Sequence, residues 1–143
     1  DEAAERARAR TFRPRPVGVD ADRPACQVVS AAGRASPSYP SGSATVGTAF
    51  GHVLAALVPE QAGALTRIGH EIAVSPMVCG LHYPADVAAG EQLGEAVFEA
   101  VALTPAFAAD AEAARREIAA ARSAGLTSPA CAAERAALAT PLP

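Results

Sequence analysis

A histidine and a carboxylate, His82 and Asp86, stand four residues apart in the sequence. Pro84 lies between them and is tolerated in a first helical turn, so we expect His82 just before a helix and Asp86 inside its first turn. A carboxylate there can bond one imidazole nitrogen, fix the tautomer and leave the other nitrogen as a nucleophile. The alternative is structural: Asp86 complements the helix dipole and His82 is an ordinary buried imidazole.

A tight turn, Pro40-Ser41-Gly42-Ser43, precedes a segment with apolar residues on one helical face, Ala44–Val58. Free backbone N–H groups at a helix start, beside the positive end of the dipole, form an anion site. Gly42 allows the main chain to approach a ligand closely. The alternative is that Ser41 or Ser43 merely caps the helix.

A basic run lies near the start of the chain: Arg6, Arg8, Arg10, Arg13 and Arg15. Guanidinium groups are permanently charged and fit phosphate oxygens bidentately, which makes Arg8 and Arg15 candidate phosphate holders. Without the other motifs, a solvated basic run would be the simpler interpretation. A helix is expected over Asp1–Arg10, because the segment is acidic at its start and basic at its end.

Taken together, the three pieces resemble the phosphate-pocket signature of the type 2 phosphatidic acid phosphatase superfamily, which includes bacterial class A acid phosphatases and vanadium haloperoxidases. That pattern has a Lys seven residues before Arg-Pro, then Pro-Ser-Gly-His, then Ser-Arg with a His and an Asp at fixed intervals. Arg8 stands for the Lys and Arg15-Pro16 for the Arg-Pro, while Ser75, His82 and Asp86 keep the third spacing. The flanking residues are most similar to the class A branch.

The resemblance implies a helical bundle that hydrolyses phosphomonoesters without a metal or cofactor, although phosphate or vanadate can occupy the pocket. It makes His82 the nucleophile of a phosphohistidine intermediate and Asp86 its orienting partner. The phosphate holders it implies are Arg8, Arg15 and the Ser41–Ser43 turn. Relatives of this branch are exported, so a periplasmic or secreted protein is expected.

Two positions depart from the family pattern: Ser43 replaces its second-motif His, and Pro76 its third-motif Arg. A general acid contributes roughly 10²–10⁴-fold to a rate, and one transition-state donor about 10²–10³-fold. We therefore expect an acid phosphatase of reduced efficiency. The alternative is a non-catalytic module that binds a phospho-ligand. A haloperoxidase-like site is disfavoured, because peroxide activation in that branch also relies on the missing residues.

With 143 residues, half of them apolar and only 4% aromatic, the chain suits a single domain over residues 1–143 with a core of Ala, Val and Leu. Ala-rich segments of helical period predict an all-α fold. Helices are expected over 44–58, 60–74, 84–103, 104–125 and 131–139, with long loops over 17–39 and 75–83.

The net charge of −3 argues against a general affinity for nucleic acid. The sequence contains neither an apolar run of about 18 residues, which a membrane span would need, nor a metal-ligand spacing.

Three cysteines allow one disulfide. Export, as the resemblance implies, would favour a pair. Cys26 and Cys131 both lie in Pro-containing, loop-like surroundings, whereas Cys79 lies near the expected pocket. We predict a Cys26–Cys131 disulfide, with three free thiols as the alternative.

Members of the family usually carry several helices before the first motif, and this chain starts almost on it. We therefore expect exposed apolar stripes, covered by a second copy or another partner, or else a trimmed chain.

Overall fold

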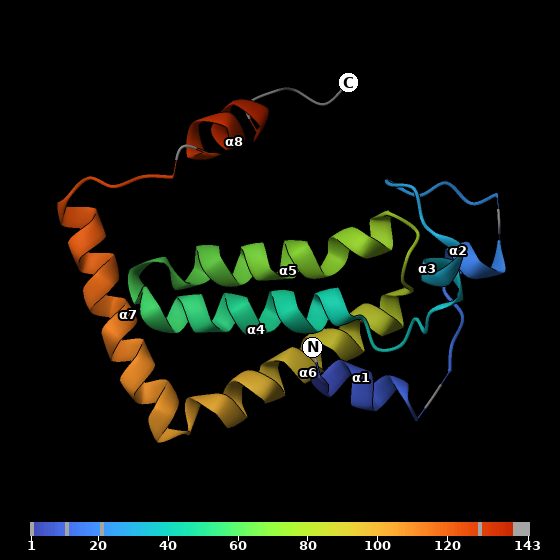
Figure 1. The fold of residues 1–143 in the computed structure, drawn as a ribbon, viewed down its shortest axis with the longest axis horizontal. Helices are drawn as coiled ribbons and strands as arrows, with labels where there is room; N and C mark the ends of the chain where they lie inside the picture. Colours follow the sequence, from blue (N-terminus) through green and yellow to red (C-terminus); the bar gives the residue numbers. More distant parts are fainter. Residues whose placement is uncertain (1, 11, 21, 129, 139–143) are drawn as a thin grey trace.

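The computed structural model describes residues 2–10, 12–20, 22–128 and 130–138, which form a set of helices without β-strands (Figure 1). The all-α prediction is therefore confirmed. The helices are α1 (Glu2–Arg8), α2 (Pro16–Val19), α3 (Ala31–Ala35), α4 (Gly42–Leu57), the 3₁₀ helix η1 (Pro59–Gln61), α5 (Ala62–Val78), α6 (Pro84–Ala102), α7 (Pro105–Ser123) and α8 (Ala130–Leu138).

The centre of the molecule is α4, which packs against α5 on one side and α6 on the other. Small residues allow this: a Cβ added to Gly69 of α5 would lie 2.7 Å from the Gly47 carbonyl oxygen of α4. Ala44, Ala73 and Val87, one from each helix, form the buried cluster between them. The core is small. The close contacts between the helices fix the ends of α4, α5 and α6 relative to one another.

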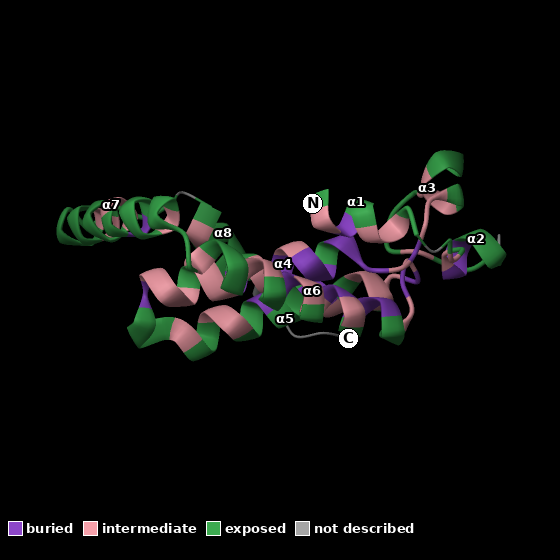
Figure 2. Cartoon of the chain, turned by 90° about the horizontal axis from the view of Figure 1, so that it is seen from below, coloured by how far each residue is buried: buried purple, intermediate pink, exposed green. Residues whose placement is uncertain are grey.

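α7 and α8 extend away from this centre. Thr104 caps α7 by accepting a hydrogen bond from the Phe107 amide at 3.2 Å, as expected from Thr104-Pro105. Figure 2 shows that α7 and α8 are largely exposed, in contrast to the buried segments around α4. Among the described residues, α8 contacts no other helix.

α5 runs to Val78, past the predicted end at Val74, so the expected loop over 75–83 begins later. Pro76 lies inside the last turn of the helix. It has no N–H to donate to the Ile72 carbonyl four residues earlier. The Ser75 hydroxyl donates to that carbonyl instead, at 3.2 Å, which explains how the helix tolerates a proline there.

The predicted loop over Val17–Tyr39 contains two short helices that the sequence analysis missed, α2 and α3. Ser30 caps α3 by accepting from the Gly33 amide at 3.1 Å. Arg34 then donates to the Val17 carbonyl at 2.6 Å and ties α3 to α2. Because these helices have four and five residues, they carry too little periodicity for a pattern to detect.

The predicted Cys26–Cys131 disulfide is wrong, because the bond joins Cys26 to Cys79, with the two Cα atoms 5.0 Å apart. The loop that carries Cys26 lies against the end of α5, where Cys79 follows the last helical residue. Cys131 is a free thiol on α8. Loop-like surroundings were a poor guide, since pairing depends on spatial approach.

Large apolar side chains are exposed on α4 and α5, as expected: Phe50 at 62%, Leu54 at 42%, Ile68 at 46% and Ile72 at 50%. We call these four residues the apolar flank. None of the described helices is both long and apolar enough to cross a membrane.

Candidate phosphate site

Main-chain hydrogen bonds join the three motif segments at one end of the bundle, where α4 and α6 begin and α2 and α3 lie (Figure 1). The Ser38 amide donates to the Arg13 carbonyl at 2.7 Å, beside a β-bridge between Pro14 and Pro37. The Ser41 amide donates to the Asp86 carbonyl at 2.9 Å. Segments that are distant in sequence are thus brought together by backbone contacts.

His82 lies just before α6, as predicted, and only 4% of it is exposed. Its Nδ1 lies 2.8 Å from the Ser38 carbonyl oxygen, which can only accept, so Nδ1 carries the proton in the neutral ring. Nε2 then keeps its lone pair. Arg15 Nη1 lies 3.3 Å from Nε2, so this nitrogen faces a guanidinium.

The surroundings of His82 favour its neutral form. Burial, followed by the positive charge of Arg15, lowers the pKa of His82 from 6.5 to about 4. Arg8 acts in the same direction, while the Ser38 carbonyl and Asp86 oppose it. The imidazole is therefore neutral down to acidic pH, with its Nε2 lone pair accepting a hydrogen bond from Arg15.

Asp86 is fully buried in the first turn of α6 and accepts hydrogen bonds from separate segments of the chain. The donors are Arg13 Nη1 at 2.9 Å, the Ser38 hydroxyl at 2.6 Å and the Tyr83 amide at 2.8 Å. The bond from Tyr83 means that Asp86 also caps the start of α6, where its charge can complement the helix dipole as the alternative interpretation expected.

The expected direct hydrogen bond from His82 to Asp86 is absent from these contacts, since Nδ1 and Oδ2 are 3.8 Å apart. Ser38 stands between them: its carbonyl accepts from the imidazole and its hydroxyl donates to the carboxylate. Asp86 is therefore linked to His82 through Ser38. Ser38 is fully buried and was not among the predicted site residues. Its place just before Tyr39-Pro40, in a flanking segment of the second motif, was the signal that could have found it.

Arg8 and Arg15, the two predicted cations, both reach this end of the molecule. Arg15 Nε donates to Ser36 Oγ at 2.9 Å, and Arg8 Nε donates to the Pro40 carbonyl at 3.3 Å while its Nη1 pairs with Glu5 at 2.5 Å. Burial and then Arg8 lower the pKa of Arg15, against a smaller opposing effect of Asp86. The two guanidinium groups repel each other, and an anion bound between them would offset that repulsion.

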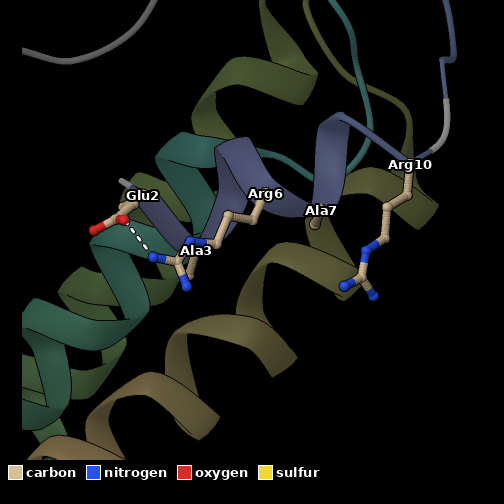
Figure 3. A pocket seen from close by; sticks show the side chains of 5 residues that line it. All are labelled: Glu2, Ala3, Arg6, Ala7 and Arg10. Carbon is tan, nitrogen blue, oxygen red and sulfur yellow. Dashed lines mark hydrogen bonds and ion pairs between the residues drawn. The ribbon is translucent and has the colours of Figure 1, made fainter.

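The rest of the basic run divides between two places. Arg6 and Arg10 line a separate hollow of about 400 Å³ along α1, where Arg6 pairs with Glu2 at 2.5 Å (Figure 3). Arg13 instead belongs to the site: it binds Asp86 and lies 4.2 Å from the centre of the Tyr83 ring. The sequence analysis did not select Arg13. Alternate side chains of an extended segment point to the same side. In Arg13-Pro14-Arg15 this alternation puts Arg13 on the side of Arg15 and could have identified it as a site residue.

The Ser41–Ser43 turn forms the start of α4. Ser41 is fully buried, and its hydroxyl caps the helix by accepting from the Ala44 amide at 3.2 Å, so the capping interpretation is correct for this side chain. The groups that remain for an anion are the amides of Gly42 and Ser43 in the first turn. α6 fits against the turn because Gly90 has no side chain: a Cβ there would lie 2.5 Å from the Ser41 carbonyl oxygen.

The two departures from the family pattern lie on the same cavity. Ser43 at the start of α4 and Pro76 near the end of α5 both line a space of about 260 Å³. Among the described residues, no group of three or more His, Cys, Asp or Glu side chains could hold a metal ion.

The amino-acid sequence is similar to those of bacterial acid phosphatases. The chain is 34% identical over 110 residues to an acid phosphatase of Zymomonas mobilis, covering 76% of this chain and 42% of the relative. It is 40% identical over 74 residues to a non-specific acid phosphatase of Salmonella typhimurium, covering 52% and 30% respectively. A non-specific acid phosphatase of Providencia stuartii is 30% identical over 82 residues.

The chain thus spans between 30% and 42% of the length of these curated relatives. No protein-family model matches the sequence.

Proposed function

We propose that the chain carries the phosphate-binding and nucleophilic part of an acid phosphatase that acts on small phosphomonoesters with reduced efficiency. The observation that carries this proposal is His82: it is buried, its Nδ1 is held by the Ser38 carbonyl, and its Nε2 faces Arg15. The similarity to acid phosphatases supports the same reaction class.

In the proposed reaction, Arg8, Arg15 and the first amides of α4 hold the phosphate oxygens. The Nε2 lone pair of His82 attacks phosphorus and forms an N–P bond, while the bond to the alcohol oxygen breaks and its electron pair leaves with that oxygen. Water supplies the proton to this alkoxide, because Ser43 does not titrate near neutrality. A second water then attacks phosphorus, releasing phosphate and restoring neutral His82.

The low pKa of His82 suits work in acid. Burial and Arg15 lower this pKa to about 4, so the imidazole remains a nucleophile at pH values where an ordinary histidine is protonated. We expect the rate to fall on the acid side as the pH passes through about 4.

A second candidate function is a non-catalytic phosphate or phospho-ligand binding module. The observation that favours it is the lack of a replacement acid, since the other two histidines of the chain have partners of their own. His52 stacks on Phe98 at 5.3 Å, and His70 lies 2.6 Å from Glu91. Neither is placed to protonate a leaving group beside Ser43.

The proposal also includes the compartment in which the protein acts. The Cys26–Cys79 disulfide supports an oxidising compartment, periplasmic or secreted. We also expect that the pocket works without a cofactor, that phosphate or vanadate fills it, and that a second copy or another partner covers the apolar flank. Residues 1–143 would act as one domain.

The test is hydrolysis of p-nitrophenyl phosphate between about pH 4 and 7, with competitive inhibition by inorganic phosphate. Wild type should turn over slowly and His82→Ala not at all. Arg15→Ala should weaken phosphate binding at least roughly tenfold, whereas Arg6→Ala, from the same basic run but outside the site, should not. Phosphate binding without His82-dependent turnover would select the binding module. Equal phosphate affinity in wild type and Arg15→Ala would refute both.

A further inference from the structure

The cavity that holds both departures adjoins the phosphate site. Ser43 follows Gly42 in the turn that offers amides to the phosphate, and Leu81 precedes His82; both line the cavity. A group bonded to a phosphate in the site therefore has this space beside it. In the family pattern a histidine and an arginine occupy the positions of Ser43 and Pro76, so the smaller side chains of this chain leave room there.

The lining of the cavity is uncharged. It combines the Ser43 and Ser75 hydroxyls and the Gln27 amide with apolar surface from Pro76, Leu81 and the Cys26–Cys79 disulfide. The disulfide fastens the loop that carries Gln27 to the end of α5, which holds the amide at the cavity edge. Hydroxyls and an amide both donate and accept, while no lining side chain would pair with a charge.

The volume limits the occupant. About 260 Å³ lies below the roughly 300–1,000 Å³ of pockets that enclose drug-sized ligands. It therefore suits a group of about one ring and excludes a nucleoside diphosphate or a peptide.

We propose that this cavity is a subsite for the alcohol part of the substrate, and that it selects an uncharged, hydroxyl-bearing group of about one ring, such as a monosaccharide. The inference rests on the proposed function, because it assumes a phosphate held by Arg8, Arg15 and the start of α4. Gln27 is its specificity-determining residue, since it lines the cavity without belonging to the phosphate pocket.

The experiment compares three stable phosphonates by calorimetry, so that binding is measured without turnover: methylphosphonate, benzylphosphonate and the methylenephosphonate analogue of a hexose 6-phosphate. Wild type should bind the hexose analogue roughly tenfold more tightly than methylphosphonate, as expected for one or two added hydrogen bonds. Gln27→Ala and Gln27→Leu, both in an exposed loop, should each remove most of that preference without changing methylphosphonate affinity. Gln92→Ala, an exposed glutamine on α6, is the matched control and should change neither.

Each other outcome overturns a defined claim. Equal affinity of wild type for methylphosphonate and the hexose analogue, or equal weakening of both by the two variants, would reject the subsite while leaving the phosphate pocket intact. Benzylphosphonate binding as tightly as the hexose analogue would reject the selection for hydroxyls. Failure of all three to bind would reject the proposed function itself, and the subsite with it.

Discussion

The motif-bearing end of the molecule and the apolar flank use opposite kinds of contact. At the motif-bearing end, buried polar groups such as Ser38 and Asp86 are satisfied by partners from distant segments. Along the flank, Phe50 and Ile72 of neighbouring helices are exposed at 62% and 50%. The buried polar groups of the motif-bearing end thus find their hydrogen-bond partners within the chain. The apolar flank, in contrast, exposes surface that a monomer would normally bury.

This difference shows which part of the molecule depends on buried hydrogen bonds for its stability. A buried carboxylate is tolerable only while its donors are present, so the hydrogen bonds around Asp86 hold the three motif segments together as well as link Asp86 to His82. The ion pairs on exposed helix surfaces do not hold the motif segments together. Substitutions at the two places should therefore differ sharply in effect.

The largest effect is expected from Asp86→Ala. It leaves the Ser38 hydroxyl, the Tyr83 amide and the Arg13 guanidinium without their buried acceptor, so the free energy of unfolding should fall by about 3–5 kcal/mol. Urea denaturation measures it. The control is Glu71→Ala, which breaks the exposed 2.6 Å pair with Arg67 on α5 and should cost at most about 0.5 kcal/mol. Similar losses in both would remove the contrast between the two regions.

The next effect is a gain. If His82 is correctly aimed, Ser43→His with Pro76→Arg should raise the rate of p-nitrophenyl phosphate hydrolysis by about 10²-fold or more, and by far more than either change alone. Because Pro76 lies inside α5, the arginine also restores an N–H to the helix. Pro76→Ala restores that N–H without the guanidinium and serves as the control.

Circular dichroism should establish that the double variant is folded before rates are compared. A folded double variant no faster than wild type would mean that His82 is not aimed at phosphorus. In that case these two side chains would not be what limits the chemistry.

The disulfide should contribute somewhat less. Cys26→Ser with Cys79→Ser opens a link between residues 53 apart, and should lower the free energy of unfolding by about 2–4 kcal/mol. Cys131→Ser, on the helix that contacts no other described helix, should have almost no effect on it. Mass spectrometry without reduction checks the pairing directly, and a peptide linking Cys131 to Cys26 would contradict it.

The smallest effect is a pH dependence. The unfolded chain binds a second proton on the His82 ring below about pH 6.5. In the folded protein the pKa of His82 is about 4, so the ring binds that proton only at lower pH. Between these values the unfolded state holds more protons, so stability falls as the pH falls, by about 2 kcal/mol between pH 7 and pH 5. Phosphate in the site should reduce the loss by favouring the imidazolium. A His82→Asn protein that shows the same slope would assign the pH dependence to other groups.

Local signals in the sequence were sufficient for most of the longer helices. Apolar residues of helical period, Pro84 in a first turn and the Thr104-Pro105 start predicted α4, α6 and α7 to within a few residues, because capping and periodicity act over one or two turns. Motif spacing likewise brought out His82, Asp86, Arg8 and Arg15. These residues all reach one end of the bundle.

Tertiary structure decided what links those residues. The route from Asp86 to His82 through Ser38, the recruitment of Arg13 and the choice of Cys79 as the partner of Cys26 all depend on segments that are distant in sequence. Such contacts are made only after the helices pack, and the glycines that let α4 approach α5 and α6 set their geometry. A sequence pattern records which groups are available, while packing determines which of them meet.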